Sequence, residues 1–322
     1  MGRCVILGGS GFIGTELSKR LLAADHEVTV VDIVPASLPG VRYVPCDVRN
    51  LEILKVAVQG HEVMYNLAAA HRDDVRPVSL YHEVNVDGAR NSCLAAEAAG
   101  IQKIVFTSSV AVYGESPNEL TEDSPHNYIN EYGRTKSLAE NEYRAWQAAD
   151  AGRSLTILRP TVVFGPGNRG NVYNLIKQIR SGLFLMVGDG DNRKSMAYVG
   201  NISDFLAFAS AMPPGQLIVN YADKPDFDML TLVRLVRGAY GKSGTGLRIS
   251  ASAASWIGRS ADLVAKLLHV RLPVSSVRIQ KFRANTQVAA ERIRETGFVP
   301  KTSLQDGLMQ TLQSEGARQT FS

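Results

Sequence analysis

The stretch ILGGSGFIG, at residues 6–14, constrains the fold more than any other part of this chain. An apolar run typical of a buried strand comes before Gly8, Gly11 and Gly14, and apolar residues at helical spacing come after them. Glycine is entropically costly in a regular element, so three glycines in seven residues need a local reason. A glycine turn between a strand and a helix directs backbone N–H groups and the positive helix end toward a phosphate. The stretch therefore predicts a phosphate-binding turn at the start of an α/β fold.

Up to about residue 160, short β-rich runs alternate with helical patterns, which predicts a parallel sheet with helices on both faces. The expected strands lie at 3–7, 27–31, 41–45, 62–67, 102–107 and 154–159, and the expected helices at 12–24, 50–58, 77–99 and 131–150. After residue 165 helices dominate, near 171–181, 201–210, 228–239, 251–268 and 288–295. We expect a Rossmann-type doubly wound sheet at 1–165, completed by part of 200–222, and a smaller mixed α/β cap at 166–322 over the sheet's carboxyl edge, where ligands bind.

Charge and cysteine content exclude several classes of protein. The net charge of +4 is spread along the chain without a Lys/Arg block, which does not suggest nucleic-acid binding. Cys4, Cys46 and Cys93 lack CxxC spacing, which argues against a disulfide framework or a metal site. With no signal peptide or apolar run of membrane length expected, the chain is predicted to be cytoplasmic. The apolar stretch at 251–270 raises a membrane question, and we interpret it as a buried amphipathic helix.

An acidic residue ends the second expected strand, in the sequence VTVVDI. Asp32 lies 18 residues after Gly14. An acid at that point suits the ribose hydroxyls of NAD and repels the additional phosphate of NADP. The alternative is an ordinary surface aspartate, but its spacing from the glycine turn favours NAD as the cofactor.

A hydroxyl, a phenol and a lysine follow in FTSSVAVYG (106–114) and YGRTK (132–136). Tyr132 and Lys136 are four residues apart, so both project from one face of a helix. An ammonium beside the phenol favours the phenolate and so lowers the pKa of the tyrosine. Ser109 adds a hydroxyl at the same sheet edge. A YxxxK pattern is common by chance, but after a dinucleotide turn these three residues indicate an acid/base set for proton transfer during hydride transfer.

With these motifs the chain resembles the extended short-chain dehydrogenases/reductases that act on nucleotide sugars, the NAD-dependent epimerase/dehydratase family. The resemblance covers nearly the whole chain and is carried by GGSGFIG, CDVRN, NLAAAH, VNVDGARN, FTSSVAVYG, YGRTK, LRPTVVFGPG, GDGDNRKSMAYVGN and TGFVP. It implies Ser109, Tyr132 and Lys136 as the catalytic residues.

The resemblance also implies where NAD would bind. Asp47 and Val48 would flank the adenine, Asn85 would lie on the helix behind the active site, and Ser108 would lie beside the nicotinamide. Each also has a plain structural interpretation, as a helix cap or as core. The expected cofactor-binding residues are Gly8, Gly11, Phe12, Ile13, Gly14, Asp32, Ile33, Asp47, Val48, Leu67, Ala68, Ala69, His71, Asn85, Thr107, Ser108, Tyr132, Lys136, Pro160 and Val162.

For the substrate, the resemblance places a basic residue of GDGDNRKSMAYVGN on the nucleotide diphosphate. Lys194, next to Arg193, falls at that place, and the alternative is a solvated surface pair. The expected substrate-binding residues are Ser109, Val110, Tyr132, Asn171, Arg193, Lys194 and Arg278.

Departures from the family patterns narrow the reaction. Sugar 4,6-dehydratases carry Asp-Glu after the catalytic hydroxyl residue, where this chain has Val110 and Ala111, so elimination is not expected. We expect a 4-epimerase of UDP-hexose or UDP-N-acetylhexosamine that acts through a transient 4-keto sugar. Val162 stands where the UDP-galactose type has an Asn, which keeps an NDP-4-keto-6-deoxyhexose reductase as an alternative. A non-catalytic NAD-binding regulator is a minor alternative.

The resemblance finally implies a homodimer, in which the helices near 77–99 and 131–150 pair with their symmetry mates as a four-helix bundle. A second apolar face on these helices supports it, formed by Cys93, Ala96, Leu138, Ala145 and Ala149. We expect no nucleic-acid partner and no membrane span.

Overall fold

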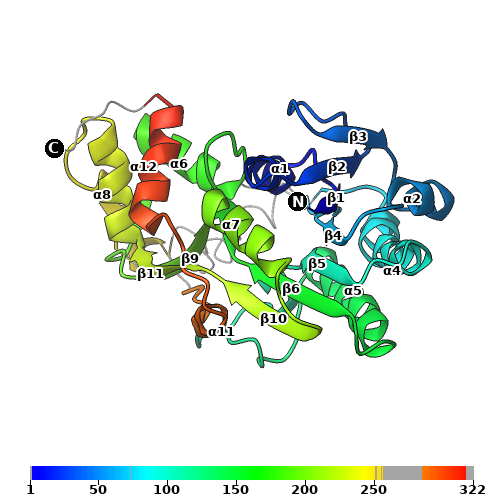
Figure 1. The fold of residues 1–322 in the computed structure, drawn as a ribbon. Coiled ribbons are helices and arrows are strands. Elements are labelled where there is room, and N and C mark those ends of the chain that lie inside the picture. The colour runs from blue at the N-terminus through cyan, green and yellow to red at the C-terminus, as the bar shows by residue number, and fades with distance from the viewer. Residues whose placement is uncertain (1, 73, 251, 255, 257–284, 317–322) are drawn as a thin grey trace.

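Seven parallel strands form the central sheet, in the order β10-β6-β5-β4-β1-β2-β3 (Figure 1). The structure is a computed structural model that describes residues 2–72, 74–250, 252–254, 256 and 285–316. The strand order reverses between β1 and β4, which makes the sheet doubly wound and confirms the expected Rossmann-type architecture. Its strands are β1 (Arg3–Leu7), β2 (Glu27–Asp32), β3 (Arg42–Pro45), β4 (Val63–Asn66), β5 (Lys103–Thr107), β6 (Ser154–Pro160) and β10 (Gly215–Tyr221).

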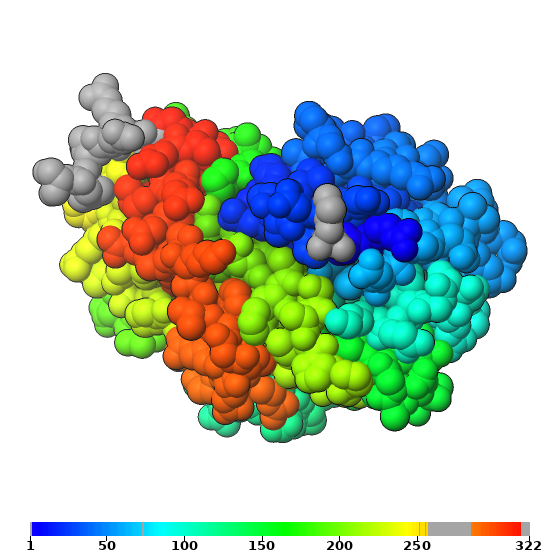
Figure 2. Space-filling view, viewed as in Figure 1, coloured from blue at the N-terminus to red at the C-terminus, as the bar shows by residue number. Residues whose placement is uncertain are grey.

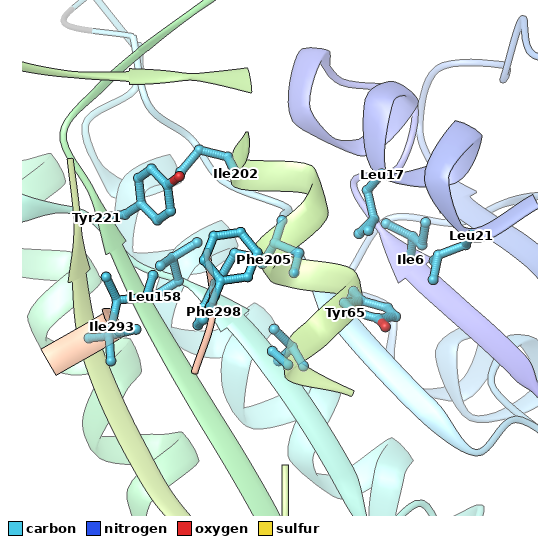
Figure 3. Close-up of a cluster of buried hydrophobic side chains, with 14 of the residues drawn as sticks. Ile6, Leu17, Leu21, Tyr65, Leu158, Ile202, Phe205, Tyr221, Ile293 and Phe298 are labelled. Carbon is cyan, nitrogen blue, oxygen red and sulfur yellow. The ribbon is translucent and has the colours of Figure 1, made fainter. Parts of the chain in front are cut away.

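Helices cover both faces of the sheet, because successive residues of each buried strand point to opposite sides. Cys4 and Ile6 of β1 pack on one face with α1 (Phe12–Ala23) and α7 (Val199–Ala209), and Figure 3 shows part of this cluster. Val5 and Leu7 pack on the other face with α2 (Leu51–Ala57), α4 (Gly88–Ala98) and α5 (Glu131–Ala148). The near-continuous apolar strands of the sequence are explained by this double burial.

The helix expected at 77–99 is three pieces. A short α3 (Ser79–His82) leads into a π-helical turn (Glu83–Asp87) and then α4. Gly88 follows the π turn at a close approach, since a Cβ there would lie 2.8 Å from Val48 Cγ2. Asn85 lies in the π turn, where its side chain reaches the loop after β4. Such turns recur at functional sites.

The cap has its own core beside the carboxyl edge of the sheet. Apolar residues of α6, α8 and α12 form this core with the strands of two small sheets. Figure 2 shows the same division on the surface, with the N-terminal third (blue to cyan) at one end and the yellow and red C-terminal segments at the other. The cap elements are β7 (Val162–Phe164), β8 (Leu185–Val187), β9 (Arg193–Tyr198), β11 (Asp223–Asp228), β12 (Leu247–Ile249), α6 (Asn171–Ser181), α8 (Met229–Ala239), α11 (Glu291–Glu295) and α12 (Leu304–Ser314).

Two features of the second half bear on what the sequence suggested. β10 returns from the second half to pair with β6, within the stretch 200–222 that was expected to complete the sheet. α12 was not predicted, although Ser303 caps it by accepting a hydrogen bond from Asp306 N at 3.0 Å. The helix expected at 251–268 falls mostly outside the described residues. Within the described ranges, no helix has the length and apolarity needed to cross a bilayer.

Candidate active site

The glycine turn after β1 is shaped for a close backbone approach. Gly8 adopts φ +74°, and a Cβ on it would lie 2.6 Å from Ala68 N. An L side chain there would be strained and would collide with the loop after β4. Gly11 then provides the N-cap of α1, whose first residue is Phe12. The open N-terminus of α1 therefore faces a cavity rather than a side chain, as anion binding requires.

Asp32 is held in place by the turn and by its own strand end. Its Oδ2 accepts a hydrogen bond from Ser10 N at 2.9 Å, and its Oδ1 accepts one from Val34 N at 3.0 Å. Ile33 beside it is 71 % exposed, an apolar surface next to the carboxylate. A fixed carboxylate with lone pairs to spare can accept hydrogen bonds from two ribose hydroxyls.

A cavity of about 1900 Å³ lies at the carboxyl edge of the sheet, between the glycine turn and the cap. It exceeds the ~300–1,000 Å³ of ordinary small-molecule sites, so it can take a dinucleotide and a second ligand together. It brings together most residues expected from the sequence: Gly8, Gly11, Phe12, Ile13, Gly14, Leu67, Ala69, His71, Thr107, Ser108, Ser109, Val110, Tyr132, Lys136, Pro160, Val162 and Asn171.

Several expected residues lie elsewhere. Asn85 is buried behind the cavity, where its Oδ1 accepts from Ala70 N at 2.8 Å and its Nδ2 donates to Thr135 Oγ1 at 2.9 Å. It therefore fixes the loop that follows β4. Ala68, Asp32 and Ile33 flank the cavity without lining it.

The expected adenine and diphosphate residues are also outside the cavity lining. Asp47 binds the Arg49 guanidinium at 2.7 Å, and Val48 is buried. Arg193 is exposed on β9, and its neighbour Lys194 is half-buried. Burial lowers the pKa of Lys194, and the nearby Glu115 carboxylate acts to raise it. Arg278 lies outside the described residues. Roles for these residues stay predictions.

The first turn of α5 sets Tyr132 against the end of β5. Asn130 caps the helix by accepting from Gly133 N at 2.9 Å. A Cβ on Gly133 would lie 2.3 Å from Ala111 O, so only glycine lets the helix approach the turn Val110–Val112 this closely. Ser109 is the N-cap of that turn, and its hydroxyl hydrogen-bonds the Tyr132 phenol. The two oxygens expected from the sequence thus meet.

Burial governs the protonation of both side chains expected to be catalytic, Tyr132 and Lys136. Burial raises the pKa of Tyr132, and the hydrogen bond with Ser109 opposes it. Burial lowers the pKa of Lys136 to about 7, with the Glu140 carboxylate opposing. The expectation that Lys136 brings the Tyr132 pKa below its ordinary value is therefore wrong for the chain alone, because burial disfavours the phenolate and is the largest influence on its pKa. The Lys136 Nζ lies 4.3 Å from the centroid of the Phe106 ring.

A buried ion pair supports this wall of the cavity. Arg159 of β6 and Glu140 of α5 are 1 % and 0 % exposed, with Nη2 and Oε2 2.5 Å apart. Ser108 donates its hydroxyl to Glu140 Oε1 at 2.6 Å, so this side chain is bound within the wall. His126 Nε2 lies 2.8 Å from Arg159 Nη2 and must accept, which leaves Nδ1 to donate to Ser137. The network ties β5, β6 and α5 together one helical turn from Lys136.

Apart from Val162 and Asn171, sequence reasoning missed the cap residues that line the cavity. Arg169 lines it and forms a 2.7 Å ion pair with Glu315, the residue that follows α12. The backbone of 285–288 forms another wall, where Thr286 bridges to Lys194 of β9. These residues follow no local motif, and contacts more than a hundred residues apart in sequence bring Arg169 to its partner at the site. In the sequence, the one signal for these cap residues was the glycine-rich stretch GPGNRGN before α6.

The residues present fit NAD. A Cβ at Gly8 would fill the space that the glycine turn leaves open, the Asp32 carboxylate bound to that turn suits a ribose, and Lys136 and Tyr132 line the same cavity as the turn. The Thr107 hydroxyl, at this edge of the sheet, is buried without a hydrogen-bond partner among the described residues. Among those residues, no His, Cys, Asp or Glu group could hold a metal ion.

Comparisons with known proteins agree with this geometry. The model of the family described as "NAD dependent epimerase/dehydratase family" matches residues 4–220. An N-acetyl-alpha-D-glucosaminyl-diphospho-ditrans,octacis-undecaprenol 4-epimerase of Escherichia coli O157:H7 is 43% identical over 97% of this chain and 94% of its own length. A UDP-glucose 4-epimerase of Vibrio cholerae is 29% identical over 98% of this chain and 96% of its own.

Solved structures share the fold. MoeE5 in complex with UDP-glucose and NAD superposes with a TM-score of 0.76 at 23% identity, covering 98% of both chains. The UDP-glucose 4-epimerase of Thermus thermophilus in complex with NAD has the same TM-score and identity, covering 98% of this chain and all of its own. At this identity the likeness concerns the arrangement of elements rather than the substrate.

Proposed function

The chain belongs to the NAD-dependent epimerase/dehydratase family and is an NAD-dependent 4-epimerase, and on that premise we propose that it inverts C4 of an N-acetylhexosamine carried on a diphosphate. The observation that carries the proposal is the meeting of Ser109, Tyr132 and Lys136 in one cavity with the glycine turn. A site with this acid/base set suits alcohol oxidation and its reversal.

In the proposed mechanism Tyr132 moves the proton at the sugar's 4-oxygen. As the phenolate, its Oη takes the proton of the 4-hydroxyl and becomes the phenol, which gives the proton back after the sugar has turned, with Ser109 as the second hydrogen-bond partner of that oxygen. NAD, which the Gly8 turn and Asp32 would hold, would supply the hydride acceptor and donor for C4. Lys136 supplies a cation beside the phenol. Because its pKa is about 7, this side chain can also be neutral, which avoids part of the free-energy cost of burying an ammonium that is always charged.

We propose a polyprenol as the carrier of the diphosphate sugar. The relative that is 43% identical acts, by its printed name, on a lipid-linked sugar, while the relative named for UDP-glucose is 29% identical. The cavity is open to the surface, and its cap wall includes Asn171 and Arg169. A carrier other than a nucleotide could leave the cavity along that side. A UDP-linked N-acetylhexosamine is the alternative carrier.

Direct comparison of the two carriers tests this proposal. The chain is supplied with catalytic NAD and either N-acetylglucosaminyl-diphospho-polyprenol or UDP-N-acetylglucosamine, and the C4 configuration of the product is followed by NMR. We expect the galacto epimer from the polyprenyl substrate, with no net NADH. Turnover of the UDP-sugar alone would overturn the carrier and leave the epimerase. Stoichiometric consumption of reduced cofactor would instead point to a 4-keto-sugar reductase.

We also propose a cytoplasmic homodimer formed by α4 and α5. The proposed compartment rests on three cysteines that are all free and buried. For the dimer, Leu94 and Ala145 are exposed on these helices, whereas Cys93 and Ala96, expected on the same face, are buried in the chain's own core. Sedimentation velocity at micromolar concentration should show a dimer, and a Leu94→Glu variant should shift it to monomer. A parent protein that sediments as monomer would contradict the proposal.

A further inference from the structure

Three leucines lie exposed together on the cap. β8 and β12 pair in parallel, with Leu185 directly opposite Leu247, and Leu183 comes two residues before Leu185. Leu183 is 82 % exposed and Leu247 is 66 % exposed. We call Leu183, Leu185 and Leu247 the leucine patch. Trp256, nine residues after Leu247, is 71 % exposed as well. Single exposed apolar residues are ordinary, but a contiguous group of large ones marks an interaction surface.

The charged residues in the segments around the leucine patch are all cations, up to Asp189 and Asp228 at their borders. Residues 171–188 and 229–256 contain six cations and no Asp or Glu, although the chain holds 31 acidic residues in all. The six are Lys177, Arg180, Arg234, Arg237, Lys242 and Arg248.

Hydrogen bonds place two of these cations, Lys242 and Arg248, beside the patch. Lys242 Nζ donates to Arg180 O at 2.5 Å, which joins the ends of α6 and α8. Arg248 follows Leu247 on β12 and donates to Gly188 O at 3.2 Å, at the end of β8. Arg248 also pairs with Asp189 at 3.1 Å, which offsets one charge. The leucine patch is therefore rimmed by cations.

We propose that the leucine patch and its cationic rim dock the protein on the surface of an anionic phospholipid bilayer. Exposed leucines enter the interface while Lys and Arg contact anionic head groups, as in other peripheral membrane proteins. The choice of occupant rests on the proposed function, since a polyprenyl diphosphate sugar is held in a bilayer. A second copy of this chain fits less well, because a symmetric contact would set the cations of one patch against those of the other.

The docking surface and the cavity are joined by one helix. α6 begins at Asn171, which lines the cavity, and ends at Ser181, two residues before Leu183. Its 11 residues span about 16 Å. α6, α8 and α12 lie together at the left end of the molecule in Figure 1. The bilayer would thus meet the cap, and the sheet with its cofactor turn would stay away from it.

Vesicle binding tests the proposal with the full chain and no substrate. We expect the protein to co-sediment with phosphatidylcholine vesicles that contain phosphatidylglycerol, and to bind phosphatidylcholine vesicles or high-salt samples much less. Leu183→Ser/Leu185→Ser/Leu247→Ser should lower the partition coefficient by about tenfold or more. Lys242→Gln/Arg248→Gln should lower it by about tenfold or more as well, since each cation near the surface contributes about fivefold.

A matched control removes apolar surface elsewhere. Val56, on α2 beside the sheet, is 75 % exposed, and Val299, after α11, is 76 % exposed. The double variant Val56→Ser/Val299→Ser should therefore bind vesicles like the parent. Equal binding of the parent to vesicles with and without phosphatidylglycerol would overturn the proposal. A loss of vesicle binding in this control equal to that of the leucine variant would overturn it as well. So would a leucine variant that loses self-association in sedimentation velocity while its vesicle binding is unchanged. If neither carrier were epimerised while vesicles still bound the protein, the proposed function alone would be rejected.

Discussion

Tyr132→Phe should reduce turnover of the sugar by roughly 10²–10⁴-fold, the usual loss for a general acid/base. The substitution keeps the ring and its packing and removes the oxygen that hydrogen-bonds Ser109. The affinity for NAD and the melting temperature should therefore stay close to those of the parent. Turnover is measured by NMR with saturating substrate, and NAD binding by calorimetry.

Tyr128→Phe is the matched control. Tyr128 precedes the same helix, is 42 % exposed and does not line the cavity, so its loss of a hydroxyl should leave turnover unchanged. If Tyr132→Phe turned over like this control, the proton at the 4-oxygen would go to another group, and the role of the first turn of α5 would have to be abandoned.

Glu140→Gln should destabilise the protein by about 3–5 kcal/mol, because it leaves Arg159 buried without its counter-charge. Glu52→Gln, which breaks the exposed pair with Lys55 on α2, should cost only about 0.2–1 kcal/mol. Both values come from denaturant unfolding near neutral pH. A loss for Glu140→Gln no larger than for Glu52→Gln would show that the network contributes little to stability.

Acid supplies a second readout for the same variant. Burial acts to raise the pKa of Glu140, but the hydrogen bonds and charge of Arg159 and the hydrogen bond from Ser108 hold it below its ordinary value of 4.5. A depressed pKa gives stability that is present above the unfolded value and lost as the pH falls through the folded one. The parent should therefore lose this stability below about pH 4.5 and Glu140→Gln should not, so the two should converge on acidification.

Short-range patterns were enough to predict the chemistry of the site. The Gly8 turn, Asp32 and the Tyr132/Lys136 pair each depend on fewer than 25 residues of chain, because a turn, a strand end and one helix face decide where they point. Local spacing also predicted the strands of the first half, where double burial leaves continuous apolar runs.

Long-range contacts account for what the sequence did not reveal. Glu140 and Arg159 look like surface charges in the sequence, and only the packing of α5 on β6 turns them into a buried pair. Arg169 reaches its partner Glu315 across 146 residues. The pKa of Tyr132 was misjudged for the same reason, since spacing predicts the neighbour but not the depth of burial.

The return of β10 to the edge of the sheet limits how this protein can evolve or be engineered by recombination. The polypeptide crosses from the cofactor half to the cap after β6 and crosses back before β10 pairs with it. A gene fusion or truncation at the first crossing alone would strip the sheet of its last strand and leave β6 as a bare edge, ready to pair with foreign strands. New sugar specificities can therefore be exchanged between such enzymes only by recombination at two or more breakpoints, with the returning strand kept alongside its original partner.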